Sequence, residues 1–200
     1  METVLLTPHY YPSCEDISAF LERRKRAFQL LSDATEHKKT PRLICGAEVY
    51  LERGISKDSD FQKLCIPGTD CVLLEMPYRS LEDWMVEEAE AICYTQNCRL
   101  ILAHLTRYIP YYDEAAFEAL VSLPNTVIQI NVGDLLYGSS RKMVLGWMER
   151  GFPLLFGSDC HNLDSRAPNL ETAAKQLTKP HHGVSLADIA NQMALELGWI

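Results

Sequence analysis

Short apolar runs alternate along the chain with longer segments whose apolar residues recur at helical spacing. Proline, glycine and asparagine separate many of the helical segments from the runs that follow. Strands that alternate with helices form βα units, which build a parallel sheet with helices packed on it. The pattern predicts strands at 4–7, 43–47, 72–74, 100–103, 127–130 and 154–158, and helices at 15–37, 80–97, 113–123, 139–150, 170–177 and 185–197.

One helix start carries an additional signal. Ser80 and Asp83 have the spacing of a capping box, in which a side chain before the helix and one in its first turn satisfy backbone N–H groups. We therefore expect the second helix to open at Ser80.

Five of the six predicted strands run into a residue that can bind a divalent metal ion. Parallel strands place their carboxyl ends on one face, and barrels built from βα units carry their active sites there. We therefore expect these side chains to converge on one multi-metal hydrolytic site, while the sixth strand runs into Asn131, a weaker ligand. The candidate ligands are His9, Glu48, Glu75, His104, Asp159 and His161.

Each candidate also has a simpler interpretation. A histidine after a strand is as compatible with a surface position as with a metal site, and a carboxylate there can be solvated. Two arginines follow the candidate ligands: Arg107 lies three residues after His104, and Arg166 closes the segment that begins at Asp159. Either guanidinium is suited to grip a phosphate with two hydrogen bonds, and the competing interpretation is a surface salt bridge.

Composition narrows the class of protein. Residues 1–200 fit a single domain that is long enough to bury a core. A formal charge of -8 argues against nucleic acid or an anionic membrane as the main partner. No apolar stretch approaches the roughly 20 residues of a membrane span, and the first residues lack a signal-peptide pattern. Seven cysteines without a C-x-x-C pair favour reduced, mostly buried thiols and a cytoplasmic protein.

Taken together, these segments resemble the bacterial protein-tyrosine phosphatases of the polymerase-and-histidinol-phosphatase (PHP) superfamily, which act in capsule and exopolysaccharide biosynthesis. The resemblance runs in order and spacing over essentially the whole chain, and its last segment is the most specific. It is carried by Leu6-Thr7-Pro8-His9-Tyr10, Gly46-Ala47-Glu48, Leu74-Glu75-Met76-Pro77, residues 103–108, Gln129-Ile130-Asn131-Val132-Gly133 and residues 158–169.

The resemblance implies a fold, an activity and a ligand set. The fold is a distorted seven-stranded (β/α) barrel, an α/β architecture. The activity is metal-dependent hydrolysis of phosphotyrosine on proteins, with a bacterial tyrosine kinase as the expected substrate. Manganese, in a two- or three-metal cluster, is the expected cofactor, and Glu75 is the expected bridging ligand. Arg107 and Arg166 stand where the family holds the phosphate, as substrate-binding and catalytic residues. The six candidate ligands stand at the family's metal positions.

The chain also departs from the family pattern. The family opens with a strand that carries an H-x-H pair, and Met1 falls after that point. About one βα unit, on the order of 30 residues, is therefore expected to be missing, which leaves six strands. An open strand edge invites pairing with another chain, so self-association is a further expectation.

Two other functions compete with a phosphotyrosine phosphatase. One is a small-molecule phosphoesterase of the histidinol-phosphatase type, and the other is a truncated, non-catalytic homologue with a regulatory or binding role. Turnover of a phosphotyrosine peptide against histidinol phosphate separates the first rival, and metal content separates the second. Cys160 lies between two candidate ligands, and we expect it to point away from both rather than to act as a nucleophile.

Overall fold

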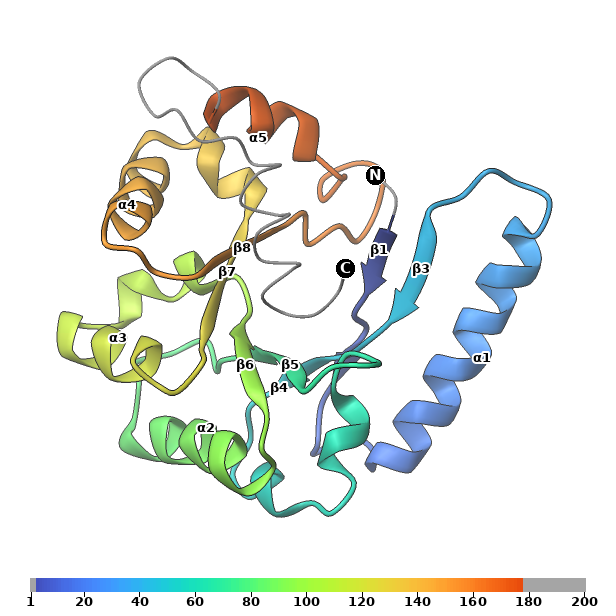
Figure 1. Cartoon of the computed structure of the whole chain (residues 1–200), viewed down its shortest axis with the longest axis horizontal. Coiled ribbons are helices and arrows are strands. Elements are labelled where there is room, and N and C mark those ends of the chain that lie inside the picture. The colour runs from blue at the N-terminus through green and yellow to red at the C-terminus, as the bar shows by residue number, and fades with distance from the viewer. Residues whose placement is uncertain (1–2, 178–200) are drawn as a thin grey trace. The chain divides into compact units, whose positions relative to one another are not determined.

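The computed structural model describes residues 3–177, and its contacts divide the chain into two compact units, 1–100 and 101–200 (Figure 1). The predicted helix at 185–197, together with His181 and His182, lies outside the described residues. Within residues 3–177, no helix is long and apolar enough to cross a membrane.

The N-terminal unit pairs its strands in parallel throughout. Strand β1 pairs with β3, and a second group has the order β2, β4, β5. Helix α1 follows β2, and α2 follows β5. The bounds are β1 (Thr3–Leu6), β2 (His9–Tyr10), α1 (Ile17–Thr35), β3 (Arg42–Cys45), β4 (Glu48–Tyr50), β5 (Cys71–Glu75) and α2 (Asp83–Thr95), with short 3-10 helices at Ile55–Lys57 and Phe61–Leu64.

The first two predicted strands each continue beyond a break. The sequence pattern places His9 and Glu48 just after the end of a strand. In the structure they are instead the first residues of the short strands β2 and β4. Proline has no N–H to donate, so Pro8 interrupts the ladder between β1 and β2. Its carbonyl oxygen still accepts a hydrogen bond from the Glu48 N–H at 3.1 Å, which keeps the two chain segments side by side through the break.

The first two helices differ in how their N-termini are capped. Asp16 caps α1, because its Oδ1 accepts a hydrogen bond from the Ala19 N–H at 2.7 Å. The predicted capping box at Ser80 is wrong: α2 begins at Asp83, and its N-cap is Glu82, which makes no side-chain capping bond. The Glu82 carboxylate instead pairs with Arg79 and accepts a hydrogen bond from Trp84 Nε1.

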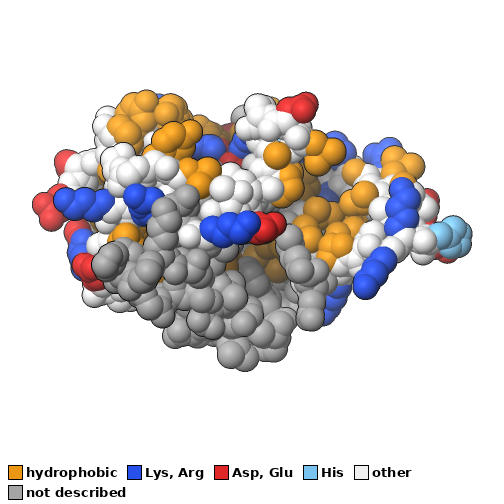
Figure 2. Space-filling view, turned by 90° about the horizontal axis from the view of Figure 1, so that it is seen from above, with side chains coloured by type: hydrophobic (Ala, Val, Ile, Leu, Met, Phe, Trp, Pro, Cys, Tyr) orange, Lys and Arg blue, Asp and Glu red, His pale blue; other side chains and the backbone are white. Residues whose placement is uncertain are grey.

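Helix α1 buries only its first turn. Ile17 and Phe20 lie in the core, whereas Leu30 is 71% exposed and Leu31 is 39% exposed. Figure 2 shows Lys and Arg side chains beside hydrophobic ones on the part of the surface that α1 forms. His37, just beyond α1, is exposed.

The C-terminal unit repeats the βα pattern with the strand order β6, β7, β8, all parallel. The helices between its strands have the predicted positions to within one to three residues at each end. Its elements are β6 (Arg99–Leu102, which starts at the boundary), α3 (Glu114–Val121), β7 (Val127–Asn131), α4 (Gly138–Glu149), β8 (Leu154–Gly157) and α5 (Leu170–Leu177), with 3-10 helices η3 (Leu105–Arg107), η4 (Ile109–Tyr111) and η5 (Val132–Leu136).

The seven cysteines are free thiols, and four of them are buried in the N-terminal unit. Burial raises the pKa of the Cys93 thiol to about 11, because the thiolate form loses its hydration. The sulfur atoms of Cys65 and Cys98 lie 3.4 Å apart. These side chains behave as small hydrophobic residues of the core.

Candidate active site

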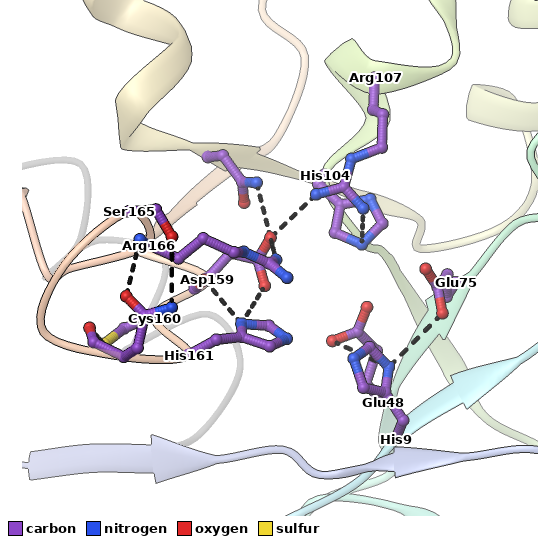
Figure 3. A network of polar contacts seen from close by, with 12 residues as sticks. His9, Glu48, Glu75, His104, Arg107, Asp159, Cys160, His161, Ser165 and Arg166 are labelled. Atoms are coloured by element: carbon purple, nitrogen blue, oxygen red, sulfur yellow. Dashed lines mark hydrogen bonds and ion pairs between the residues drawn. The ribbon is translucent and has the colours of Figure 1, made fainter.

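Three of the six predicted ligands meet in the N-terminal unit. One ligand atom from each of His9, Glu48 and Glu75 lies within 4.8 Å of the others, and the three side chains point toward one another in Figure 3. His9 Nδ1 is 3.6 Å from Glu75 Oε2 and 4.0 Å from Glu48 Oε2. Two ligands that each bind an ion at about 2.0–2.2 Å stand up to roughly 4.4 Å apart, so this triad has the dimensions of a metal site.

Strand register explains why these three residues meet. His9 in β2 is paired with Glu48 in β4, so their side chains leave neighbouring strands on the same face. Tyr50 lies two residues beyond Glu48, on that same face, and is paired with Glu75 in β5. Three parallel strands therefore bring one imidazole and two carboxylates to a single face.

The triad is partly shielded from water and rich in negative charge. The side chains of Glu48 and Glu75 are 6% and 13% exposed, and that of His9 is 34% exposed. A buried carboxylate is costly unless it is paired or bound to a metal, and here two carboxylates share one imidazole. The geometry therefore favours a bound cation.

Two tyrosine rings extend from the triad. The Tyr11 ring is stacked 5.6 Å from the His9 ring and lies 5.4 Å from the Tyr50 ring. Burial raises the pKa of the Tyr11 hydroxyl, and the negative charges of Glu75 and Glu48 raise it further. The tyrosines are neutral donors beside an acidic cluster.

In the C-terminal unit, the other predicted residues gather around Asp159. Its Oδ2 accepts hydrogen bonds from Arg107 Nη2 at 3.0 Å and from Arg166 Nη2 at 2.5 Å (Figure 3). His161 Nδ1 lies 3.0 Å from the Asp159 carbonyl oxygen and 3.5 Å from its Oδ1. His104 Nε2 lies 3.3 Å from Arg107 Nη1. The predicted ligands and both predicted phosphate-binding arginines of this unit thus form one cluster.

Local backbone geometry aims these side chains. His104 follows β6 and Asp159 follows β8, and both take the left-handed conformation, with φ of 34° and 48°. This conformation costs roughly 1–2 kcal/mol for most L-residues and is more tolerable for aspartate and histidine. The 3-10 helix η3 then places Arg107 beside the imidazole ring of His104, which lies three residues earlier, because residues i and i+3 eclipse in such a helix.

Arg166 is positioned by a folded loop. Asn162 Oδ1 accepts hydrogen bonds from the N–H groups of Asp164 and Arg166, each at 2.9 Å. The His161 N–H donates to the Arg166 carbonyl oxygen at 3.0 Å. These bonds bring the loop back on itself, so that a guanidinium seven residues after Asp159 reaches its carboxylate.

Two amide side chains of β7 support the cluster, and one of them was not predicted. Asn131, expected to be a weak ligand, donates from Nδ2 to Asp159 Oδ2 at 3.0 Å. Gln129 accepts a hydrogen bond from the His104 N–H at 2.5 Å and donates to Asn131 Oδ1 at 3.2 Å. A glutamine inside the apolar run Val127–Ile130 was the sequence signal for this buried link.

Gly157 makes room for that link. A Cβ added to it would lie 2.8 Å from Gln129 Nε2, closer than real contacts allow. A side chain at this end of β8 would therefore displace the Gln129 amide from its present position.

These contacts set the charge of Asp159. Burial raises the pKa of its carboxyl group, but the Asn131 hydrogen bond, the electrostatic effect of His104 and the contact with Arg166 together outweigh burial. The net effect holds the pKa of Asp159 below its usual range, so the group is an anion at neutral pH. Cys160, between Asp159 and His161, directs its sulfur to the Asn162 carbonyl oxygen at 3.4 Å, away from both side chains, as expected.

The two clusters lie in separate units, and the prediction that all six ligands meet at one place stays a prediction. The structure bears on each cluster by itself: His9, Glu48 and Glu75 come together, and so do His104, Asp159 and His161 with the two arginines.

The fold matches a known class of protein. It is similar, with a TM-score of 0.78, to a chain from "Crystal structures of YwqE from Bacillus subtilis and CpsB from Streptococcus pneumoniae, unique metal-dependent tyrosine phosphatases". The match covers 98% of this chain and 80% of that one, at 20% sequence identity. This match confirms the predicted α/β fold class with a parallel sheet.

The sequence itself identifies the family. Residues 1–195 match the family described as "Capsular polysaccharide synthesis, CpsB/CapC", and the chain belongs to that family. No curated protein matches the chain.

Proposed function

We propose that this protein is a metal-dependent phosphatase that hydrolyses phosphotyrosine on proteins. The observation that carries the proposal is the triad of His9, Glu48 and Glu75, in which two shielded carboxylates and an imidazole stand at ligand distances. Membership of a capsular polysaccharide synthesis family supports it, as does a fold shared with proteins described as metal-dependent tyrosine phosphatases.

The donor set fits a hard divalent cation. Oxygen and imidazole nitrogen donors suit Mn²⁺, Fe²⁺ or Zn²⁺ better than Cu⁺, which prefers sulfur ligands. We propose Mn²⁺, as two or three ions, for which His9, Glu48 and Glu75 of the N-terminal unit and His104, Asp159 and His161 of the C-terminal unit would supply the ligands. Such ions, when bound, supply a hydroxide nucleophile near neutral pH and neutralise phosphate oxygens.

The chain's own cations hold the phosphate. Arg107 and Arg166 are preorganised by their shared contact with Asp159. Little side-chain entropy is therefore lost when their guanidinium groups donate hydrogen bonds to a phosphate. Donors held where charge develops lower the barrier most, and the equatorial phosphate oxygens carry that charge during in-line displacement. Tyrosinate then leaves as a stable anion.

The proposal extends to the domain organisation, the cellular compartment and the substrate. We propose residues 1–200 as a single PHP-type phosphatase domain that acts in the cytoplasm. Its substrate would be a bacterial tyrosine kinase that regulates capsule or exopolysaccharide synthesis. The formal net charge of -8 argues against nucleic acid as the substrate.

Metal removal tests the proposal directly. The purified chain is treated exhaustively with a chelator, its metal content is measured by elemental analysis, and p-nitrophenyl phosphate and a phosphotyrosine peptide are assayed before and after adding Mn²⁺. We expect activity to vanish with the metal and to return with it. Full activity after chelation, together with its loss when the exposed thiols of Cys14 and Cys160 are alkylated, would contradict the metal mechanism.

A parallel assay separates the competing function. Histidinol phosphate is compared with the phosphotyrosine peptide at equal concentration. Preference for histidinol phosphate would reassign the chain as a small-molecule phosphoesterase, and absence of turnover on every substrate with metal bound would leave it a binding protein.

A further inference from the structure

The N-terminal unit contains an open pocket that the proposed hydrolysis does not use. Its volume is about 230 Å³, and it lies where the chain leaves β4 and β5. Tyr50, Arg53, Pro77, Arg79 and Trp84 are among the residues that line it.

Two guanidinium groups and an indole give the pocket its chemistry. The Arg53 guanidinium lies 4.4 Å from the centre of the Trp84 ring, and that of Arg79 lies 5.9 Å from it. Trp84 is fixed, because it is 8% exposed and its Nε1 donates to Glu82. Stacking on an aromatic ring orients a guanidinium while leaving its N–H groups at the edge of the plane for an anion.

The two arginines retain donors for a ligand. Within the described part of the chain, Arg53 forms no ion pair and its side chain is exposed. Arg79 pairs with Glu82 through Nε, at 3.3 Å. The acidic residue of the lining, Glu52, already accepts a hydrogen bond from Ser13 Oγ at 2.8 Å. The lining therefore contains two positive groups and one negative group, the Glu52 carboxylate.

The pocket is continuous with the metal triad through the strands that carry both. Tyr50 is paired with Glu75, and Pro77 lies two residues beyond Glu75. Two residues of extended chain span roughly 7 Å. A polypeptide with one residue at the triad therefore reaches the pocket with a residue a few positions away.

We propose that this pocket binds an anionic side chain, a carboxylate or a phosphate ester, that lies within a few residues of the phosphotyrosine in the polypeptide substrate. The proposal rests on the proposed function and deepens it, since it names the sequence context that the enzyme selects. Arg53 is the principal anion-binding residue, Trp84 orients it, and Arg79 adds a second positive charge.

Peptide selectivity is the first test. Three phosphotyrosine peptides are compared, with Gln, with Glu, or with a second phosphotyrosine at the flanking positions. Each kcat/KM is divided by the same variant's value for p-nitrophenyl phosphate, so that only discrimination between peptides is read. We expect the native chain to favour an anionic flank about fivefold, the upper range for an exposed ion pair. In Arg53→Gln the preference should fall below about twofold.

A matched control removes the same charge elsewhere in the unit. Arg42, an exposed residue of β3 that does not line the pocket, is changed to Gln. Arg42→Gln should keep the native discrimination.

Preference for the Glu peptide identifies a carboxylate as the ligand, and preference for the doubly phosphorylated peptide alone identifies a phosphate ester. Equal discrimination in the native chain and in Arg53→Gln overturns the proposal.

A binding measurement tests the pocket separately from catalysis. Fluorescence anisotropy of labelled, unphosphorylated peptides is followed with the chelated, metal-free chain at low ionic strength. The acidic peptide should bind about fivefold more tightly than the neutral one, and Arg53→Gln should abolish the difference. If the chain hydrolyses nothing yet shows this Arg53-dependent binding, the proposed function fails and the pocket stands. If it hydrolyses phosphotyrosine without any Arg53-dependent effect, the pocket fails.

Discussion

The two clusters contain similar residue types but have opposite balances of charge. In the N-terminal unit, the carboxylates of Glu48 and Glu75 stand beside the imidazole of His9. In the C-terminal unit, one carboxylate, Asp159, accepts hydrogen bonds from two guanidinium groups and an amide. By their own residues, the first cluster is the more acidic of the two, and the second is the more basic.

This difference indicates what each cluster recruits. An acidic cluster shielded from water is stabilised by a cation, so the triad of His9, Glu48 and Glu75 is the stronger metal site of the two. Guanidinium groups held in place by Asp159 are suited to an anion such as phosphate. We therefore propose that metal is retained chiefly by the N-terminal unit and that phosphate is bound chiefly by the C-terminal one.

Removing a carboxylate from the triad should have the largest effect. Glu75→Gln keeps the shape of the side chain but removes a charged ligand. Loss of supporting groups around a metal already costs about 10–100-fold in affinity or activity, so we expect a loss of more than about 100-fold in turnover, with a fall in metal per chain. Elemental analysis and the p-nitrophenyl phosphate assay measure both. Glu87→Gln, at an exposed position of α2, is the control and should change neither.

The arginines should affect catalysis without emptying the triad. We expect Arg166→Ala and Arg107→Ala each to lower kcat by about 10²-fold, by analogy with other preorganised donors, while metal per chain is retained. Circular dichroism checks that both variants fold, and Lys142→Ala, exposed on α4, is the control. Unchanged turnover in both variants would show that these arginines only form surface salt bridges. It would contradict the proposal that the C-terminal cluster binds phosphate.

The buried amide of β7 should matter for stability. Gln129→Leu removes the acceptor of the His104 N–H and leaves that buried group without its partner. An unsatisfied buried donor costs about 1–3 kcal/mol, so the free energy of unfolding should fall by that amount. Urea denaturation of the metal-free chain measures it. A change smaller than about 0.5 kcal/mol would mean that the link does not hold His104 in place.

A carboxylate outside both clusters provides the smallest test and a pH signature. Glu88 accepts hydrogen bonds from the N–H groups of Gly54 and Ser56 at 2.9 and 2.7 Å. Burial raises the pKa of Glu88, but its bonds with Ser56 and Gly54 and the charge of Lys57 lower it more, so the net direction is down.

The sign of the pH dependence follows from that direction. Because the folded pKa lies below the unfolded value of about 4.3, the stabilisation is present above that pH and is lost as pH falls through the folded pKa. We expect Glu88→Gln to be less stable by about 1–2 kcal/mol at pH 7, with a smaller deficit near pH 3. Thermal unfolding at both pH values measures the two differences. A deficit that does not shrink in acid would show that the charge of Glu88 is not what stabilises the loop.

The sequence by itself determined the elements and the candidate residues. Six apolar runs and the helical segments between them predicted the alternation of strand and helix, because apolar spacing reports which face of an element is buried. The ligand candidates were recognisable because charged and imidazole groups at the ends of apolar runs are conspicuous. The start of α2 was misjudged, since the Ser80 capping signal competes with the contacts of Glu82 to Arg79 and Trp84, which are not visible in the sequence.

Only the tertiary structure decided which candidates meet. Register between β2, β4 and β5 brings His9, Glu48 and Glu75 together, and register depends on hydrogen bonds between segments that lie far apart in the chain. The role of Gln129 likewise required the packing of β7 against β6 and β8, since a lone glutamine in an apolar strand does not name its partners. Local sequence determines what each segment presents on its faces, whereas long-range pairing determines which of those faces share a site.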